Sequence, residues 1–288
     1  MNVRVAAPAK INLTLRVGPA RADGLHPLQS VVAFAACGEW LEAAPADVLS
    51  LTIIGPFAAD LEADESNLVM RAARALAAAA GKPEAGAALT LFKDYPVASG
   101  IGGGSSDAAA ALKALNRLWG LNFSEAQLIE IARGLGSDTP ACVPARAAFM
   151  FGTGADFIPF DLPTLYAVLF NPRQPLPTAG VYRQFDLMAL GATFEAEAPA
   201  PVWRDAASAA AGMAVLGNDL YAPAAALMPD LNTALAQLRA DPRTLHAHMS
   251  GSGATMFALC ESLEAARGLE AAFAASNPSF WVRAGLLG

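Results

Sequence analysis

The chain is short of the residues that build disulfide frameworks and zinc sites. Its 288 residues include three cysteines, at positions 37, 142 and 260, which lie far apart and lack CxxC spacing. Neither a disulfide framework nor a cysteine-based zinc site is expected from this pattern. Such cysteine usage is typical of a reducing compartment, so we predict a cytoplasmic protein.

Positive charge and long apolar runs are also scarce. The formal net charge is −7, and lysine occurs four times, at positions 10, 82, 93 and 113. This balance argues against a surface for nucleic acid or anionic membrane. No stretch of sequence reaches the ~18 uncharged apolar residues of a membrane span, and the N-terminal segment lacks the long apolar core of a signal peptide. We therefore expect no nucleic-acid partner and no membrane partner.

The chain does have enough apolar sequence for a large core. Hydrophobic residues make up 55% of it and charged residues 16%, which argues against global disorder. Strand-like and helix-like segments alternate, a pattern that indicates an α+β or α/β protein. The proline-rich stretch 159–177 is the best boundary, so we predict two domains, 1–160 and 161–288. Helices in the first domain are predicted to begin at Ser66, Ser106 and Ser124.

The most informative motif runs from Pro96 to Asp107 and leads into an alanine-rich helix; we call it the glycine-rich segment. Its three consecutive glycines, 102–104, let backbone N–H groups approach a ligand closely. The start of a helix adds unpaired N–H donors and a partial positive charge. The alternative is a flexible hinge capped by Ser105 or Ser106, but a hinge needs neither three glycines nor two hydroxyls. The segment therefore predicts a phosphate site.

Two familiar phosphate-binding motifs do not fit the glycine-rich segment. A P-loop requires lysine after its last glycine, where this chain has Ser105. A dinucleotide fingerprint requires a third glycine, and that position holds Ser105 counted from Gly100 and Asp107 counted from Gly102. Neither a Walker-type NTPase nor a Rossmann dehydrogenase is supported.

Three separated motifs, taken in order, resemble the GHMP kinases, a superfamily named for galactokinase, homoserine kinase, mevalonate kinase and phosphomevalonate kinase. The motifs are Pro8–Leu13, the glycine-rich segment and Met249–Ala258. The resemblance implies a two-domain α+β fold. Its N-terminal α/β domain is ribosomal-protein-like, its C-terminal α+β domain is sandwich-like, and the active site lies in the cleft between them.

Four further segments resemble one branch of that superfamily. They are Arg21–His26, Glu65–Val69, Gly136–Pro140 and Asn218–Leu220. Members of this branch use ATP to phosphorylate the 2-hydroxyl of a cytidine-diphospho-methylerythritol, in the non-mevalonate route to isoprenoid precursors. Two alternatives stay open: another GHMP small-molecule kinase, of the homoserine or mevalonate type, and an inactive nucleotide-binding homologue.

Two residues are the candidates for the chemistry. Asp138 matches the family's catalytic aspartate, which would accept or orient the hydroxyl proton during phosphoryl transfer. Its alternative reading is an ordinary N-cap of a short helix, with proline in the first turn. Lys10 matches the family's lysine and would offset charge on the transferring phosphoryl group. Its alternative reading is a solvated lysine at a strand end.

The remaining binding residues come from the resemblance. ATP enters with Mg²⁺, which binds mainly through phosphates and water, so no dedicated metal ligands are expected. His26 would hydrogen-bond cytosine and Tyr182 would stack on it, a contact worth ~1–3 kcal/mol. Many members carry an aromatic residue at the position of Leu25. In this chain the second face of cytosine would therefore meet a leucine side chain without π overlap. The full prediction places ATP at Asn67, Pro96, Gly100, Gly102, Gly103, Gly104, Ser105 and Ser106, and the acceptor at Asn12, Leu25, His26, Lys93 and Tyr182.

Asp107, a histidine pair and the oligomeric state carry three smaller predictions. Asp107 is read as a structural acid favoured by the helix dipole. The pair His246 and His248 would face one side of a strand; without further ligands nearby, support for the adjacent Ser250–Gly251 loop is favoured over zinc. We expect a monomer or a weak homodimer.

Overall fold

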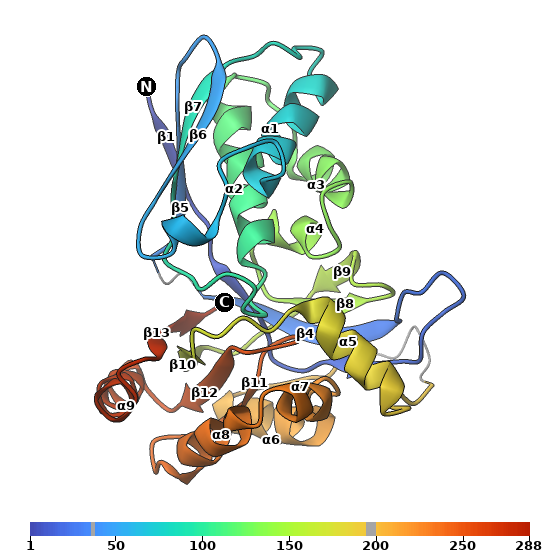
Figure 1. Ribbon diagram of the computed structural model, residues 1–288, viewed down its shortest axis with the longest axis vertical. Helices are drawn as coiled ribbons and strands as arrows, with labels where there is room; N and C mark the ends of the chain where they lie inside the picture. The colour runs from blue at the N-terminus through green and yellow to red at the C-terminus, as the bar shows by residue number, and fades with distance from the viewer. Residues whose placement is uncertain (36–37, 194–199) are drawn as a thin grey trace. The chain divides into compact units, whose positions relative to one another are not determined.

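The computed structural model describes residues 1–35, 38–193 and 200–288, so Cys37 lies outside the described residues (Figure 1). The chain forms two compact units, each assembled from separate segments. The chain crosses from one unit to the other within the first motif, after Lys10, and within the glycine-rich segment. The first unit consists of Met1–Lys10, Gly38–Val97 and Gly102–Ala145, and the second of Ile11–Cys37, Ala98–Ile101 and Arg146–Gly288.

The first unit is built on a four-stranded sheet. The strand order is β1 (Val3–Ala6), β5 (Trp40–Ala44), β7 (Ala87–Phe92), β6 (Leu49–Ile54). Strands β6 and β7 are parallel and the other neighbours are antiparallel. Apolar side chains at alternate positions of β5 and β7 are buried, as expected for a sheet with one face on a core.

Helices of the first unit are α1 (Leu68–Ala79), α2 (Gly103–Leu118), α3 (Glu125–Arg133) and α4 (Thr139–Cys142), with a short 3₁₀ turn at Ala58–Asp60. Helix α2 packs on β1, β5 and α1. Its alanines 108–111 are fully buried, so the small side chains allow this close packing. The capping box predicted at Ser124 is confirmed: its hydroxyl accepts from Gln127 N, while the Gln127 side chain accepts from Ser124 N.

Two predicted helix starts were wrong. Helix α1 is capped by Asn67, whose side chain accepts from Val69 N, and not by Ser66, whose hydroxyl donates to Asp64. Helix α2 begins at Gly103, three residues before the predicted Ser106. The glycines therefore form the first helical turn instead of a loop in front of it.

The second unit contains a nine-stranded sheet whose main path runs β11-β12-β10-β13-β4-β8-β9, with β2 and β3 also paired to β4. The hairpin β8–β9 lies just before the predicted domain boundary and was not predicted. The strand predicted to carry His246 and His248 is confirmed as β11, which pairs with β12. The strands are β2 (Ala9–Asn12), β3 (Arg16–Val17), β4 (Leu28–Ala35), β8 (Ala148–Phe151), β9 (Asp156–Pro159), β10 (Leu165–Asn171), β11 (His246–Met249), β12 (Met256–Cys260) and β13 (Trp281–Leu287).

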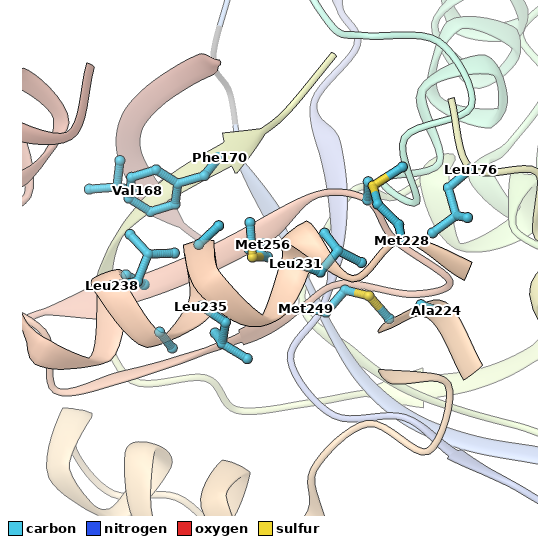
Figure 2. Close-up of a cluster of buried hydrophobic side chains, with 14 of the residues drawn as sticks. Val168, Phe170, Leu176, Ala224, Met228, Leu231, Leu235, Leu238, Met249 and Met256 are labelled. Atoms are coloured by element: carbon cyan, nitrogen blue, oxygen red, sulfur yellow. The ribbon is translucent and has the colours of Figure 1, made fainter. Parts of the chain in front are cut away.

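Helices pack on this sheet to form the core of the second unit. Leu231, Leu235 and Leu238 repeat at helical spacing along α8 and are buried with side chains of β10 and β12 (Figure 2). Among the described residues, no helix has both the length and the apolar character that crossing a membrane requires. The helices are α5 (Thr178–Leu187), α6 (Ala206–Leu216), α7 (Tyr221–Leu227), α8 (Asp230–Ala240) and α9 (Leu263–Ser276).

Candidate active site

Lys10 and Asp138, which are far apart in the sequence, form an ion pair within the first unit. Lys10 Nζ donates to Asp138 Oδ1 at 2.8 Å, although the residues are 128 positions apart. The two side chains differ in exposure: 4% for Lys10 and 35% for Asp138. The ammonium group is thus enclosed by protein, while part of the carboxylate remains open to a ligand.

Asp138 occupies an N-cap position without acting as a cap. It precedes α4, with proline in the first turn as predicted, but its side chain makes no capping hydrogen bond. The carboxylate instead turns toward Lys10. The geometry therefore disfavours the ordinary N-cap reading of Asp138, and the burial of Lys10 rules out a solvated lysine.

The start of α2 lies directly beside this ion pair. Gly102 has φ +59°, ψ 25°, a left-handed conformation that favours glycine. A Cβ on Gly102 would lie 3.2 Å from Lys10 Cε and 3.7 Å from Asp138 Oδ2. The amides of Gly103, Gly104 and Ser105 follow in the first turn, where an α-helix supplies no acceptors of its own. These donors and the Lys10 ammonium create positive potential next to the carboxylate.

The N-terminus of α1 adjoins the same turn. A Cβ on Gly104 would lie 3.3 Å from Leu68 Cδ1, which places the predicted nucleotide residue Asn67 in this neighbourhood. Both ends of its side-chain amide are used locally: Oδ1 accepts from Val69 N at 3.0 Å and Nδ2 donates to Glu62 O at 2.8 Å. Asn67 therefore holds the start of α1 in place.

Asn67→Ala is expected to reduce the free energy of unfolding by about 1 kcal/mol, because α1 loses its N-cap. Denaturant unfolding of the variant and the parent measures this difference. Ser66→Ala is the matched control, since the exposed Ser66 hydroxyl donates to Asp64 and does not cap α1, and its effect should stay within about 0.5 kcal/mol. Equal losses in both variants would contradict the assignment of the cap.

Three other residues of the predicted ATP site have different surroundings. Ser105 is half-buried on the first turn of α2. Ser106 is buried, and its hydroxyl donates to Pro8 O at 2.6 Å, so it joins α2 to the first motif. Pro96 is also buried. Of the two serines, Ser105 is the one that can offer its hydroxyl to a ligand.

Lys93 lies in a buried cluster of ionisable side chains. Its Nζ donates to Glu39 Oε1 at 2.8 Å and to Asp107 Oδ2 at 2.7 Å, and all three side chains are at most 3% exposed. This geometry does not support the predicted direct contact of Lys93 with the acceptor. Glu39 was not predicted, because nothing in the sequence pattern links it to a lysine 54 residues away.

Burial and proximity change the protonation of this cluster. Burial, reinforced by the Asp107 carboxylate, raises the pKa of Glu39 from 4.5 to about 9, although Lys93 acts in the opposite direction. For Lys93, burial alone would lower the pKa, but the adjacent Asp107 and Glu39 carboxylates outweigh it and raise the pKa. Glu39 therefore keeps its proton near neutral pH.

The raised pKa of Glu39 predicts a pH-dependent stability. The folded state holds this proton more tightly than the unfolded state, so the contribution is fully present below pH 4.5 and is lost as pH rises toward about 9. The slope approaches about 1.4 kcal/mol per pH unit within that window. Unfolding at pH 6.5 and 8.5 should show a larger loss in the parent than in Glu39→Gln. Equal losses would contradict the raised pKa.

In the second unit, the glycine-rich segment packs against the loop of the third motif. A Cβ on Gly100 would lie 2.6 Å from Gly253 O and 2.7 Å from Ser250 O, so only glycine fits. The Ser250 hydroxyl accepts from Asn12 N at 3.0 Å and donates to Gly100 O at 3.1 Å. Asn218 Nδ2 donates to Met249 O and Gly251 O, at 2.8 Å each. The Ser250 hydroxyl thus joins the predicted residues Asn12 and Gly100, and Asn218 holds the backbone on either side of Ser250.

The second unit also gathers the residues predicted to hold cytosine. The rings of His26 and Tyr182 are 5.0 Å apart, and the edge of Phe185 meets His26 at 5.6 Å. His26 Nδ1 lies 2.9 Å from Gly18 O, and Nε2 lies 3.4 Å from Asp186 Oδ1. Both ring nitrogens therefore have protein neighbours. Leu25 is 52% exposed.

The histidines of β11 show no arrangement for a metal. The rings of His246 and His248 are 6.1 Å apart, and burial lowers the pKa of each to about 4. Within the described part of the chain, no group of three or more His, Cys, Asp or Glu side chains could hold a metal ion. His248 Nδ1 accepts from Met249 N at 2.9 Å, next to the loop it was expected to support.

Family models match both parts of the chain. The model of the GHMP kinases N terminal domain matches residues 67–146, and the model of the GHMP kinases C terminal matches residues 195–279. Curated relatives named 4-diphosphocytidyl-2-C-methyl-D-erythritol kinase are similar over almost the whole chain. The relative from Hyphomonas neptunium is 46% identical, covering 98% of this chain and 95% of its own. The relative from Parvibaculum lavamentivorans is 45% identical, covering 99% and 98%.

Solved structures agree with these matches. A crystal structure of 4-(cytidine 5'-diphospho)-2C-methyl-D-erythritol kinase superposes with a TM-score of 0.79 at 33% identity, covering 99% of both chains. A homoserine kinase from Cytophaga hutchinsonii superposes with a TM-score of 0.64 at 18% identity, covering 99% of this chain and 95% of its own. The second likeness shows the fold alone. The predicted α+β GHMP fold is confirmed.

Proposed function

The chain belongs to the 4-diphosphocytidyl-2-C-methyl-D-erythritol kinases of the GHMP superfamily, and on this premise we propose that it transfers the γ-phosphoryl group of ATP to the 2-hydroxyl of 4-diphosphocytidyl-2-C-methyl-D-erythritol. The observation that carries the proposal is the Lys10–Asp138 ion pair beside the first turn of α2. Phosphoryl transfer depends mainly on positioning and charge stabilisation. This arrangement supplies a carboxylate, a cation and backbone donors within one unit.

ATP supplies the phosphoryl group, and we propose that it binds at the first turn of α2. The amides of Gly103, Gly104 and Ser105 would donate to phosphate oxygens, as at other anion-binding helix N-termini. Asn67 would contribute by fixing the adjacent start of α1. Mg²⁺ would arrive as part of the MgATP substrate, which suits a chain whose described residues provide no carboxylate cage.

Asp138 and Lys10 would act on different groups during the reaction. The exposed part of the Asp138 carboxylate would accept or orient the proton of the acceptor hydroxyl. Lys10, held at 2.8 Å from that carboxylate, would stabilise the negative charge that spreads over the transferring group. Retention of both residues in this geometry speaks against an inactive nucleotide-binding homologue.

Recognition of the acceptor would rest on the second unit. Tyr182 would stack on the cytosine ring, and the half-exposed Leu25 would offer an apolar contact without π overlap. Because Gly18 O and Asp186 lie against the His26 ring nitrogens, we propose that the main chain of His26, more than its ring, meets the base. Asn12, held by Ser30 and Ser250, would position the methylerythritol part. Direct roles for Lys93 and Ser106 are not retained in the proposal.

The remaining predictions stand as part of the same proposal. The division into residues 1–160 and 161–288 stays a prediction. The two compact units are each assembled from several separate segments, so they do not correspond to two consecutive stretches of sequence. A cytoplasmic location, which the sparse cysteines favour, and a monomer or weak homodimer also stay predictions.

An acceptor panel tests the proposed function. The protein is given MgATP with the cytidine-diphospho acceptor, homoserine or mevalonate, and ADP release is followed. We expect turnover with the cytidine-diphospho acceptor alone. Turnover on homoserine or mevalonate without turnover on that acceptor would reassign the substrate.

A further inference from the structure

The buried cluster of Lys93, Glu39 and Asp107 connects three parts of the first unit. Lys93 follows the last residue of β7, Glu39 directly precedes β5, and Asp107 lies on the first turns of α2. The Lys93 ammonium donates to both carboxyl groups, at 2.8 and 2.7 Å. Each long-range contact is thus made by ionisable groups that are almost fully withdrawn from water.

The backbone around Lys93 is fixed as firmly as its side chain. Glu39 Oε2 accepts from the amides of Asp94 and Tyr95, at 2.9 and 2.8 Å. Lys93 N donates to Ile54 O at 2.7 Å. With both its main chain and its ammonium held, Lys93 is a rigid anchor on the sheet.

The Lys93 ammonium lies against the backbone of α2 at the proposed ATP site. A Cβ on Gly103 would lie 3.1 Å from Lys93 Nζ, so the ammonium packs against the first residue of α2. Asp107, four residues further along the helix, receives a hydrogen bond from the same ammonium. One lysine therefore contacts both the first residue of α2 and the turn that follows it.

We propose that Asp107 and Lys93, backed by Glu39, are positioning residues that hold the first turn of α2 in the orientation that binds the phosphates of ATP. The inference rests on the proposed function for the identity of the ligand. In this proposal, none of the three residues touches a substrate. They act through the amides of Gly103, Gly104 and Ser105, whose directions depend on where the helix starts.

The test compares substitutions of Asp107 by direct titration of MgATP in a calorimeter, which needs no acceptor. Asp107→Ala removes the acceptor for Lys93 and should weaken ATP binding about tenfold. Asp107→Asn keeps an oxygen that accepts from Lys93 and should restore the dissociation constant to within about threefold of the parent. The KM of the cytidine-diphospho acceptor should be unchanged in both, because the residues proposed to recognise its cytosine and methylerythritol parts lie in the second unit. If Asp107→Ala is unfolded at the assay temperature, Asp107→Ser replaces it with the same expected direction.

A stability control separates positioning from general weakening of the fold. Leu128→Ala removes a buried side chain of α3 in the same unit and should lower the unfolding midpoint without changing ATP affinity. The proposal is overturned if the folded Asp107→Ala protein binds ATP as the parent does, if Asp107→Asn is no better than Asp107→Ala, or if Leu128→Ala weakens ATP binding equally. A parent protein that binds ATP but phosphorylates no acceptor would instead overturn the proposed function.

Discussion

Asp138→Asn is expected to lower kcat by about 10²- to 10⁴-fold, the usual contribution of a positioned general base, while ATP affinity stays nearly unchanged. The substitution keeps the size of the side chain and an oxygen that can accept from Lys10, so the ion-pair geometry is disturbed little. What it removes is the group that accepts or orients the hydroxyl proton. Steady-state turnover and direct ATP titration of the same preparation measure the two effects separately.

Asp205→Asn is the matched control for this prediction. Asp205 is an N-cap residue like Asp138, but its carboxylate does cap its helix, accepting from Ser208 N at 2.7 Å. Asn is an equally good cap, so this variant should turn over substrate as the parent does. If Asp138→Asn retained kcat within about tenfold of the parent, the role assigned to Asp138 would be wrong.

Lys93→Met is expected to lower the free energy of unfolding by about 3–5 kcal/mol, the cost of removing one partner from a buried ion pair. The substitution leaves the Glu39 and Asp107 carboxyl groups buried beside each other without the ammonium between them. Denaturant unfolding at constant pH measures the loss.

The matched control for Lys93→Met is Lys82→Met, which removes the same charge from an exposed position. That change should stay within about 0.5 kcal/mol. Comparable, small effects of the two substitutions would mean that the buried cluster contributes little to the fold.

Helices and strands with a strong local signal could be predicted from the sequence. Helix α8, Asp230–Ala240, carries such a signal, because its apolar residues repeat at helical spacing. Strand β5, Trp40–Ala44, was missed because Leu-Glu-Ala-Ala favours helix locally. It is a strand because it pairs with β1 on one side and β7 on the other, and such pairing outweighs local preference.

At the candidate site, local preference also failed to predict where α2 begins. Glycine has a poor intrinsic preference for helix, so the sequence places Gly103 and Gly104 in a loop. In the fold, Gly102 takes the left-handed conformation, and Asp107 is held by Lys93. These long-range contacts allow the helix to begin on the glycines themselves.

The chemical residues were found through motifs, and their partners were not. Lys10 and Asp138 were named as a pair, and the structure joins them at 2.8 Å. Lys93 was predicted to contact the acceptor, because a single lysine beside a motif carries no information on burial. Glu39 shows why: its role exists only through hydrogen bonds to residues 54 to 56 positions away.

The most direct test of the account is the position of the phosphate in the product. The protein is incubated with MgATP and the cytidine-diphospho acceptor, and the product is examined by ³¹P and ¹³C NMR. We expect one new phosphomonoester, coupled to carbon 2 of the methylerythritol and formed in equal amount with ADP. A phosphate on another hydroxyl, or ADP formed without any new phosphomonoester, would contradict it.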